Sequence, residues 1–112
     1  MKIAVCAGEK SGDALGYELL VDLKKNNSNI EIIGVGGSMM EGEGLKSFFP
    51  IKEISYMGLI DPLLNLRKIL KMRKNFINFL KKENPDVFIG IDSPSFNSVI
   101  CKVLKRDTNI KT

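Results

Sequence analysis

The chain alternates between short apolar runs and stretches in which apolar residues recur at helical spacing. Continuous apolar runs such as 2–7 and 86–91 are typical of strands buried on both faces of a sheet. Between them, apolar side chains recur every three or four residues, as on one side of a helix. The predicted strands are 2–7, 30–35, 45–49 and 86–91, and the predicted helices are 11–25, 38–44, 59–83 and 95–106. This order predicts an α/β fold with a doubly wound, mostly parallel sheet.

The ends of two predicted helices are marked by residues that commonly begin or end helices. Ser11 or Asp13 can cap the first turn of helix 11–25. The apolar side of this helix is formed by Leu15, Leu19, Leu20 and Leu23. Asn84 and Pro85 are expected to end helix 59–83, because proline cannot continue a helix.

Length and composition fit one compact domain. With 112 residues, of which 44% are hydrophobic, the chain can form a single core and is too short for two domains of ordinary size. The apolar run after Met1 is too short for a secretion signal and leads directly into Glu9 and Lys10, which indicates a cytosolic protein. No apolar run approaches the ~20 residues that cross a bilayer, so any membrane contact is expected to be peripheral.

The reactive side chains restrict the chemistry that the chain can support. Cys6 and Cys101 lie far apart without CxxC spacing, and the sequence contains no histidine that could complete a zinc site. We therefore expect two reduced, buried thiols, no metal and no cofactor. Without histidine, acid–base chemistry must depend on carboxylates or on another side chain.

Three loops follow predicted strands, and open parallel sheets bind ligands outside the carboxyl ends of their strands. Loop 7–13 contains small residues that let a backbone approach an anion, although alone it is more often a strand-to-helix turn. Gly36-Gly37-Ser38 can approach a ligand or form an ordinary turn. In loop 92–97, Asp92 follows an apolar strand, where poor solvation makes a carboxylate a stronger base, or it caps the next helix.

Four motifs occur in order along nearly the whole chain. Residues 7–16 match the pattern AGExSGDxLG, and residues 34–40 with Gly44 match a GxGGxxM signature. Residues 56–58 are similar to VMG, and residues 85–97 are similar to PDVFIGIDxPDFN. In this combination the chain resembles the lipid-A-disaccharide synthases, and the four motifs together are far more specific than any one alone.

The resemblance implies the N-terminal half of a B-type glycosyltransferase, in which two Rossmann-like domains face a cleft. Residues 1–112 would form the acceptor-side domain, incomplete at its C-terminal end, and the donor domain that binds the UDP-sugar is absent from this chain. The implied reaction transfers 2,3-diacylglucosamine from UDP-2,3-diacylglucosamine to 2,3-diacylglucosamine 1-phosphate with inversion. The products are UDP and the β-1,6-linked disaccharide precursor of lipid A, and the chain alone is expected to be inactive.

The resemblance also implies roles for individual residues. Asp92 falls on the family's essential Asp, which is expected to accept the proton of the attacking acceptor hydroxyl. The expected substrate contacts are Glu9, Ser11, Gly12, Gly36, Gly37, Met57 and Asn97. Two departures stand out: Ser95 replaces the usual Asp, and residues 106–109 differ from the family's usual LKxxGIKT ending.

The segment between Pro62 and Lys82 contains no acidic residue and projects as a cationic amphipathic helix. Both implied substrates carry acyl chains, so such a helix suits an anionic surface on the inner face of the cytoplasmic membrane. Alternatively, its apolar side packs on the sheet, which is our interpretation for the second half. The expected membrane-contacting residues are Ile60, Leu63, Leu66, Arg67, Lys68, Leu70 and Lys71.

Two other functions fit the sequence less well. A free-standing Rossmann- or flavodoxin-like binding module would need a phosphate fingerprint or a ribose-binding acid after the second strand, and Gly36-Gly37-Ser38 supplies no acid. Nucleic-acid binding would need aromatic residues among the exposed charges, whereas Phe76 and Phe79 lie on the apolar side. The expected partners are therefore the two acylated sugars, a membrane surface and a donor domain or second chain, and no nucleic acid.

Overall fold

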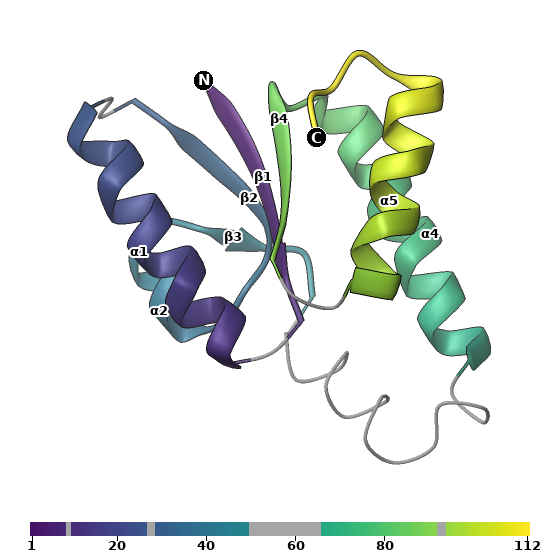
Figure 1. The fold of residues 1–112 in the computed structure, drawn as a ribbon, viewed down its shortest axis with the longest axis horizontal. Coiled ribbons are helices and arrows are strands. Elements are labelled where there is room, and N and C mark those ends of the chain that lie inside the picture. Colours follow the sequence, from purple (N-terminus) through teal and green to yellow (C-terminus); the bar gives the residue numbers. More distant parts are fainter. Residues whose placement is uncertain (9, 27–28, 50–65, 92–93) are drawn as a thin grey trace.

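A parallel sheet lies between two layers of helices (Figure 1). The structure is a computed structural model that describes residues 1–8, 10–26, 29–49, 66–91 and 94–112. Its strands are β1 (Lys2–Ala7), β2 (Glu31–Val35), β3 (Lys46–Ser47) and β4 (Val87–Ile91). Its helices are α1 (Lys10–Asn26), α2 (Ser38–Gly42), α4 (Leu66–Glu83) and α5 (Pro94–Asp107). The strands and helices alternate as predicted, and the third predicted strand is shorter than expected.

All strand pairs in the described part of the chain are parallel, and the order across the sheet is β3-β2-β1-β4. The two strands that follow β1 in the sequence extend the sheet on one side of it, and β4 pairs on its other side. The direction in which successive strands are added to the sheet therefore reverses at β1. This arrangement confirms the prediction of a doubly wound, parallel α/β sheet.

Both faces of the sheet are covered, which explains the unbroken apolar runs in the strands. On one face, alternate residues such as Ala4 and Cys6 pack against α4 and α5. On the other face, Ile3 and Val5 pack against α1 and α2. The largest fully buried side chains in these two layers include Phe76, Phe88, Leu20, Met40, Leu80, Ile100 and Leu104. Because one apolar layer lies on each face of the sheet, the packing of the helices in these layers determines which helices lie beside the end of each strand.

The region after α2 differs from the predicted strand 45–49. Only Lys46 and Ser47 pair with β2, and the N–H of Phe48 donates a last backbone hydrogen bond to the carbonyl oxygen of Gly34 (2.6 Å) before the chain leaves the sheet. Phe48 stacks on Phe79 of α4, with ring centroids 4.6 Å apart, and Phe49 meets Phe76 edge to face. Aromatic packing against α4 thus replaces the remaining strand pairs.

Helix α1 faces the core with part of the predicted side, since Leu20 is buried and Leu23 packs against the core, but Leu15 does not take part. Leu15 is 60% exposed, whereas Gly12, Asp13, Gly16 and Leu20 are buried. A Cβ atom at Gly16 would collide with the side chain of Met40. The close approach of α1 to α2 therefore requires a glycine surface, and Leu15 is turned outward.

Helix α4 ends where the sequence predicted and packs on the sheet through its second half. Phe76, Ile77 and Leu80 are buried, which confirms the predicted core packing of this half. Asn84 follows the helix with a φ of 48°, the left-handed conformation that often stops a helix. Within the described residues, no helix is both long and apolar enough to span a membrane.

Cys6 and Cys101 form no disulfide, in agreement with the predicted reduced thiols, but only Cys6 is fully buried. Cys6 lies inside β1, while Cys101 is partly exposed on α5. The prediction of two buried thiols is therefore wrong for Cys101. Cys101 lines a hollow between α5 and β4.

Candidate functional site

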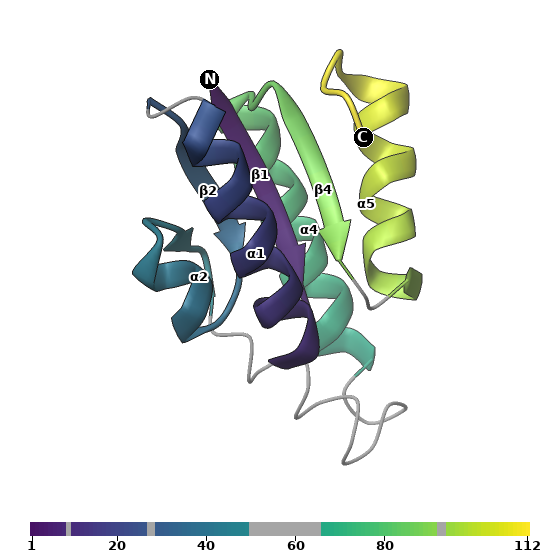
Figure 2. The same cartoon turned by 60° about the vertical axis from the view of Figure 1, so that its left-hand side comes forward.

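Three strands end at the same level of the sheet. Cys6 of β1 pairs with Val35 of β2, and Ala7 pairs with Ile91 of β4. The segments that follow these strands therefore start from one carboxyl edge (Figure 2). Ligands of open α/β sheets bind at this edge, close to the point where the strand order reverses.

The first of these segments leads into α1. Ser11 is exposed in the first turn of the helix, and Gly12 beside it is buried. Because a helix begins with N–H groups that have no partner within the helix, this turn is suited to an anionic group. Ser11 does not flank the helix as a cap, since α1 already begins at Lys10.

Asp13 caps a helix, but it caps α2 and not the predicted α1. Its Oδ1 accepts hydrogen bonds from the backbone N–H groups of Gly37 (2.9 Å) and Met40 (3.1 Å), and its Oδ2 accepts one from Met39 (3.1 Å). The residue is only 6% exposed. The carboxylate thus pairs with backbone N–H groups at the start of α2 that have no partner within the helix. These charge-assisted hydrogen bonds replace the hydrogen bonds to water that the carboxylate loses when it is buried.

The contact between Asp13 and the second loop depends on the absence of a side chain at Gly37. A Cβ atom there would lie 2.6 Å from Oδ2 of Asp13, too close for any ordinary contact. Gly36 is equally confined, because its Cβ atom would meet the Met40 and Leu45 side chains at 2.5 and 2.6 Å. Of the two glycines predicted as substrate contacts, Gly37 therefore lets Asp13 of α1 reach the start of α2, and Gly36 leaves room for the Met40 and Leu45 side chains.

The third predicted site segment is fixed by Asn97 of α5. This side chain is 5% exposed, and its amide Nδ2 donates to the carbonyl oxygens of Cys6 (3.3 Å) and Ile91 (3.4 Å). One amide group thereby holds the ends of β1 and β4 together beneath the carboxyl edge. Asn97 was predicted from the sequence, whereas this bridging contact depends on atoms 91 residues apart.

Several predicted site residues lie outside the described residues. They are Glu9, Met57, Ile60, Leu63 and Asp92. The structure thus brings together, at one edge, the first turn of α1, the Gly36-Gly37 pair and the Asn97 side chain. Asp13 was missed as a site residue, because nothing in its local sequence indicates a partner 24 positions away.

Helix α4 begins at the end of the molecule toward which the carboxyl ends of the strands point (Figure 1). In its first turns Leu66 and Leu70 are 49% and 44% exposed, although both are large apolar side chains. The neighbouring cations Arg67, Lys68 and Lys71 are exposed as well. An apolar and cationic surface therefore lies at the same end of the molecule as the candidate site.

The described residues provide no cluster of three His, Cys, Asp or Glu side chains that could hold a metal ion. The chemistry available at the described part of the edge consists of backbone N–H groups, the Ser11 hydroxyl and the cations of α4. Such groups bind and orient anionic and hydroxylated ligands.

A parallel, doubly wound sheet with glycine-containing segments at its carboxyl edge defines a Rossmann-like domain. Comparison with known families gives a more specific assignment: the profile described as lipid-A-disaccharide synthetase matches residues 3–112. The chain belongs to this family.

Two relatives illustrate the similarity. The lipid-A-disaccharide synthase of Pseudomonas fluorescens (strain Pf0-1) is 50% identical over 112 residues, all of this chain and 30% of the relative. The enzyme of the same name from Pseudomonas putida (strain F1) is 48% identical over 110 residues, 98% of this chain and 29% of the relative. The chain thus spans less than a third of the length of these relatives.

Proposed function

We propose that the chain is the acceptor-side domain of a lipid-A-disaccharide synthase. In this function, 2,3-diacylglucosamine passes from its UDP derivative to 2,3-diacylglucosamine 1-phosphate, giving the β-1,6-linked disaccharide and UDP. The family match over residues 3–112 is the observation that supports it most directly. The alignment of the ends of β1, β2 and β4 supports the position of the site.

Asp92 is the proposed general base. During inversion, the acceptor hydroxyl attacks the anomeric carbon as the bond to UDP breaks, and the hydroxyl proton passes to a carboxylate. Asp92 directly follows Ile91, whose carbonyl oxygen accepts a hydrogen bond from the buried Asn97 amide. Fixing this strand end limits the positions that the base can occupy, which is how a supporting residue favours a reactive geometry. The direct substrate contact predicted for Asn97 remains a prediction.

The other substrate contacts are assigned to the first two segments of the edge. Ser11 and Gly12 in the first turn of α1 would hold the acceptor, whose phosphate is favoured by the positive end of the helix. Gly36 and Gly37 would allow the sugar to approach the backbone of the second segment. Glu9 and Met57 are proposed as further contacts from the motif match alone.

The donor is proposed to bind chiefly to a domain outside this chain. The relatives are more than three times as long as the matched region, so they have room for a second domain. Without that domain, the UDP leaving group has no proposed binding site. The chain alone would therefore hold the acceptor and the base but not the electrophile.

The exposed start of α4 is proposed to meet the membrane. The acyl chains of both substrates place them at a lipid surface, and Leu66 and Leu70 are exposed among Arg67, Lys68 and Lys71. Apolar insertion and attraction to anionic lipid together produce peripheral binding. This would place the domain on the inner face of the cytoplasmic membrane, beside its substrates.

The test is reconstitution with the donor domain of a related synthase, supplied as a separate chain. Disaccharide formation is expected in the mixture. Asp92→Asn should lower its rate by about a hundredfold or more, because Asn keeps the shape of Asp but cannot accept the proton.

Asp22→Asn is the matched control, because this exposed carboxylate lies on α1 and pairs only with Lys25 among the described contacts. Undiminished turnover with Asp92→Asn would exclude the proposed base. If the wild-type mixture makes no disaccharide although a complex forms, the proposed function is contradicted.

A further inference from the structure

One buried carboxylate joins two of the segments at the carboxyl edge of the sheet. Asp13 lies in the first turn of α1 and is only 6% exposed. Its Oδ1 accepts hydrogen bonds from the N–H groups of Gly37 and Met40, and its Oδ2 accepts one from that of Met39. Because both oxygens of a planar carboxylate are bonded, the side chain fixes the start of α2 in distance and in orientation.

The start of α2 has no cap of its own. Gly37 precedes the helix with an extended backbone (φ −97°, ψ −165°) and has no side chain that could accept a hydrogen bond. A Cβ atom at this position would lie 2.6 Å from Oδ2 of Asp13, so the backbone and the carboxylate are in direct contact. The turn from β2 into α2 is therefore shaped by a residue of α1.

The far end of α2 is held to α1 by another contact. Nζ of Lys24 lies 3.6 Å from Oε2 of Glu43, which directly follows the helix. Met40, in the middle of α2, is fully buried in the apolar layer. Loss of the Asp13 carboxylate would therefore release the start of α2, with the Gly36-Gly37 segment, and leave the rest of the helix attached.

We propose that Asp13 is a positioning residue for the acceptor sugar. It holds the Gly36-Gly37 segment at a fixed distance from Ser11 and Gly12, so that both segments contact one acceptor molecule. This role rests on the function proposed above, in which these residues bind the acceptor. Asp13 itself touches no substrate, because its oxygens face the backbone of α2. Segments that are fixed in advance lose little conformational freedom when the ligand binds, which favours affinity.

Replacement of Asp13 by Asn tests this role with little change in shape. Asn has only one carbonyl oxygen, so its NH₂ group must face the N–H of Met39 or those of Gly37 and Met40. Two donors cannot bond to one another, so the backbone of the segment is expected to move away from α1. Asp13→Ser is a second variant, because its hydroxyl can still cap a helix but cannot replace both carboxylate oxygens.

The experiment titrates 2,3-diacylglucosamine 1-phosphate, in micelles of an uncharged detergent, into the 112-residue chain. Isothermal titration calorimetry gives the Kd and the number of binding sites separately. Asp13→Asn should raise the Kd about tenfold or more and leave the number of sites unchanged, at a temperature at which circular dichroism shows a folded variant. A purely structural role would lower the number of competent sites and leave the Kd of the remaining sites unchanged.

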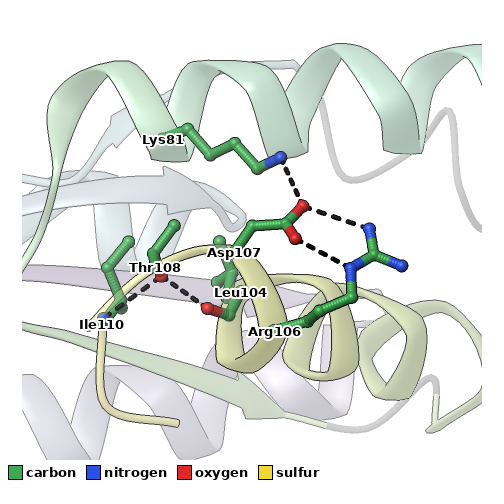
Figure 3. Close-up of polar contacts among 6 residues, drawn as sticks. All are labelled: Lys81, Leu104, Arg106, Asp107, Thr108 and Ile110. Carbon is green, nitrogen blue, oxygen red and sulfur yellow. Dashed lines mark hydrogen bonds and ion pairs between the residues drawn. The ribbon is translucent and has the colours of Figure 1, made fainter.

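Asp107→Asn is the matched control, because Asp107 also joins two helices through a carboxylate (Figure 3). It ends α5 and accepts hydrogen bonds from Arg106 at 2.8 Å and from Lys81 of α4 at 2.9 Å. These two cations hold the pKa of its carboxyl group well below the usual range. The end of α5 lies at the opposite end of the molecule from the carboxyl ends of the strands (Figure 1). This variant should therefore bind the acceptor with the Kd of the unchanged chain.

Leu23→Ala controls for a loss of stability. Leu23 is partly buried against the same apolar layer as Met40. It lies near the end of α1, whereas the carboxyl edge of the sheet lies beside the start of this helix. The substitution should lower the free energy of unfolding, because apolar contacts are lost, and leave the Kd unchanged.

The outcomes distinguish the positioning role from the proposed function. If the unchanged chain does not bind the acceptor, the proposed acceptor site is contradicted, and the positioning role with it. If the unchanged chain binds and the folded Asp13 variants bind with the same Kd, the positioning role alone is overturned. An equal rise of the Kd with Leu23→Ala or Asp107→Asn would also overturn it, because a general loss of stability would then explain the effect.

Discussion

Asp13 shows how one side chain can join two of the predicted site segments. It lies in α1, yet its carboxylate accepts three backbone hydrogen bonds from the start of α2. The bonds span 24 to 27 positions of sequence, so they form only after α1 and α2 pack together. The geometry of the Gly36-Gly37 segment therefore depends on a residue of the first motif.

We predict that Asp13→Asn destabilises the domain by about 1.5–3 kcal/mol, the usual contribution of hydrogen bonds to a buried charged group. Asn keeps one acceptor oxygen but loses the charge, and its NH₂ group faces backbone donors. Urea denaturation followed by circular dichroism measures the free energy of unfolding. Asp22→Asn, whose side chain is 76% exposed, should change it little. Equal free energies of unfolding for the two variants would show that the Asp13 cap does not stabilise the domain.

At the scale of elements, α4 combines two surfaces with different surroundings. Phe76, Ile77 and Leu80 pack in the core, whereas Leu66 and Leu70 remain exposed at the start of the helix. The helix has a regular amphipathic pattern throughout, so periodicity alone does not separate its halves. Only the position of the sheet and of α5 determines which apolar residues become buried.

We predict that the chain binds vesicles containing anionic lipid and is released by salt, because screening weakens surface electrostatics. Replacing both Leu66 and Leu70 with Ser should weaken binding about tenfold or more, as the two side chains no longer enter the lipid. Vesicle sedimentation measures the change.

The matched control for the vesicle experiment is Leu15→Ser, which alters an exposed leucine on α1, outside the cationic helix. It should bind lipid as the unchanged chain does. Equal weakening by both changes would contradict a specific role for α4, and unfolding of the Leu66 and Leu70 variant would show that these residues are core.

At the scale of the whole molecule, the sheet holds the proposed acceptor site but offers no described second domain opposite it. Holding two reactants in line can contribute roughly 7–11 kcal/mol of the reduction in the barrier. A domain that binds only one of them cannot supply this contribution. The length of the relatives is consistent with a site shared between two domains.

We therefore predict that the 112-residue chain alone makes no disaccharide from the two acylated sugars. An assay with radiolabelled acceptor, analysed by chromatography, would detect the product. The mixture with a separate donor domain serves as the positive control. Product formed by the chain alone would contradict the assignment of the donor site to another domain.

The sequence by itself determined the class of the fold and the family. Apolar runs such as 2–7 favour burial on both faces, which a parallel sheet between two helical layers provides. The ordered motifs predicted the family that the comparison then established. Each apolar run and each motif consists of residues that are neighbours in the sequence, so both can be recognised without the tertiary structure.

The tertiary structure decided what depends on pairs of distant residues. It turned Leu15 outward and buried Asp13, because α1 approaches α2 through glycines. It shortened the third strand, because Phe48 and Phe49 pack on α4. It also placed Lys111 beside Val87, where the two residues form a parallel bridge. Each outcome depends on packing between elements far apart in the chain, which hydrophobic periodicity within one element cannot encode.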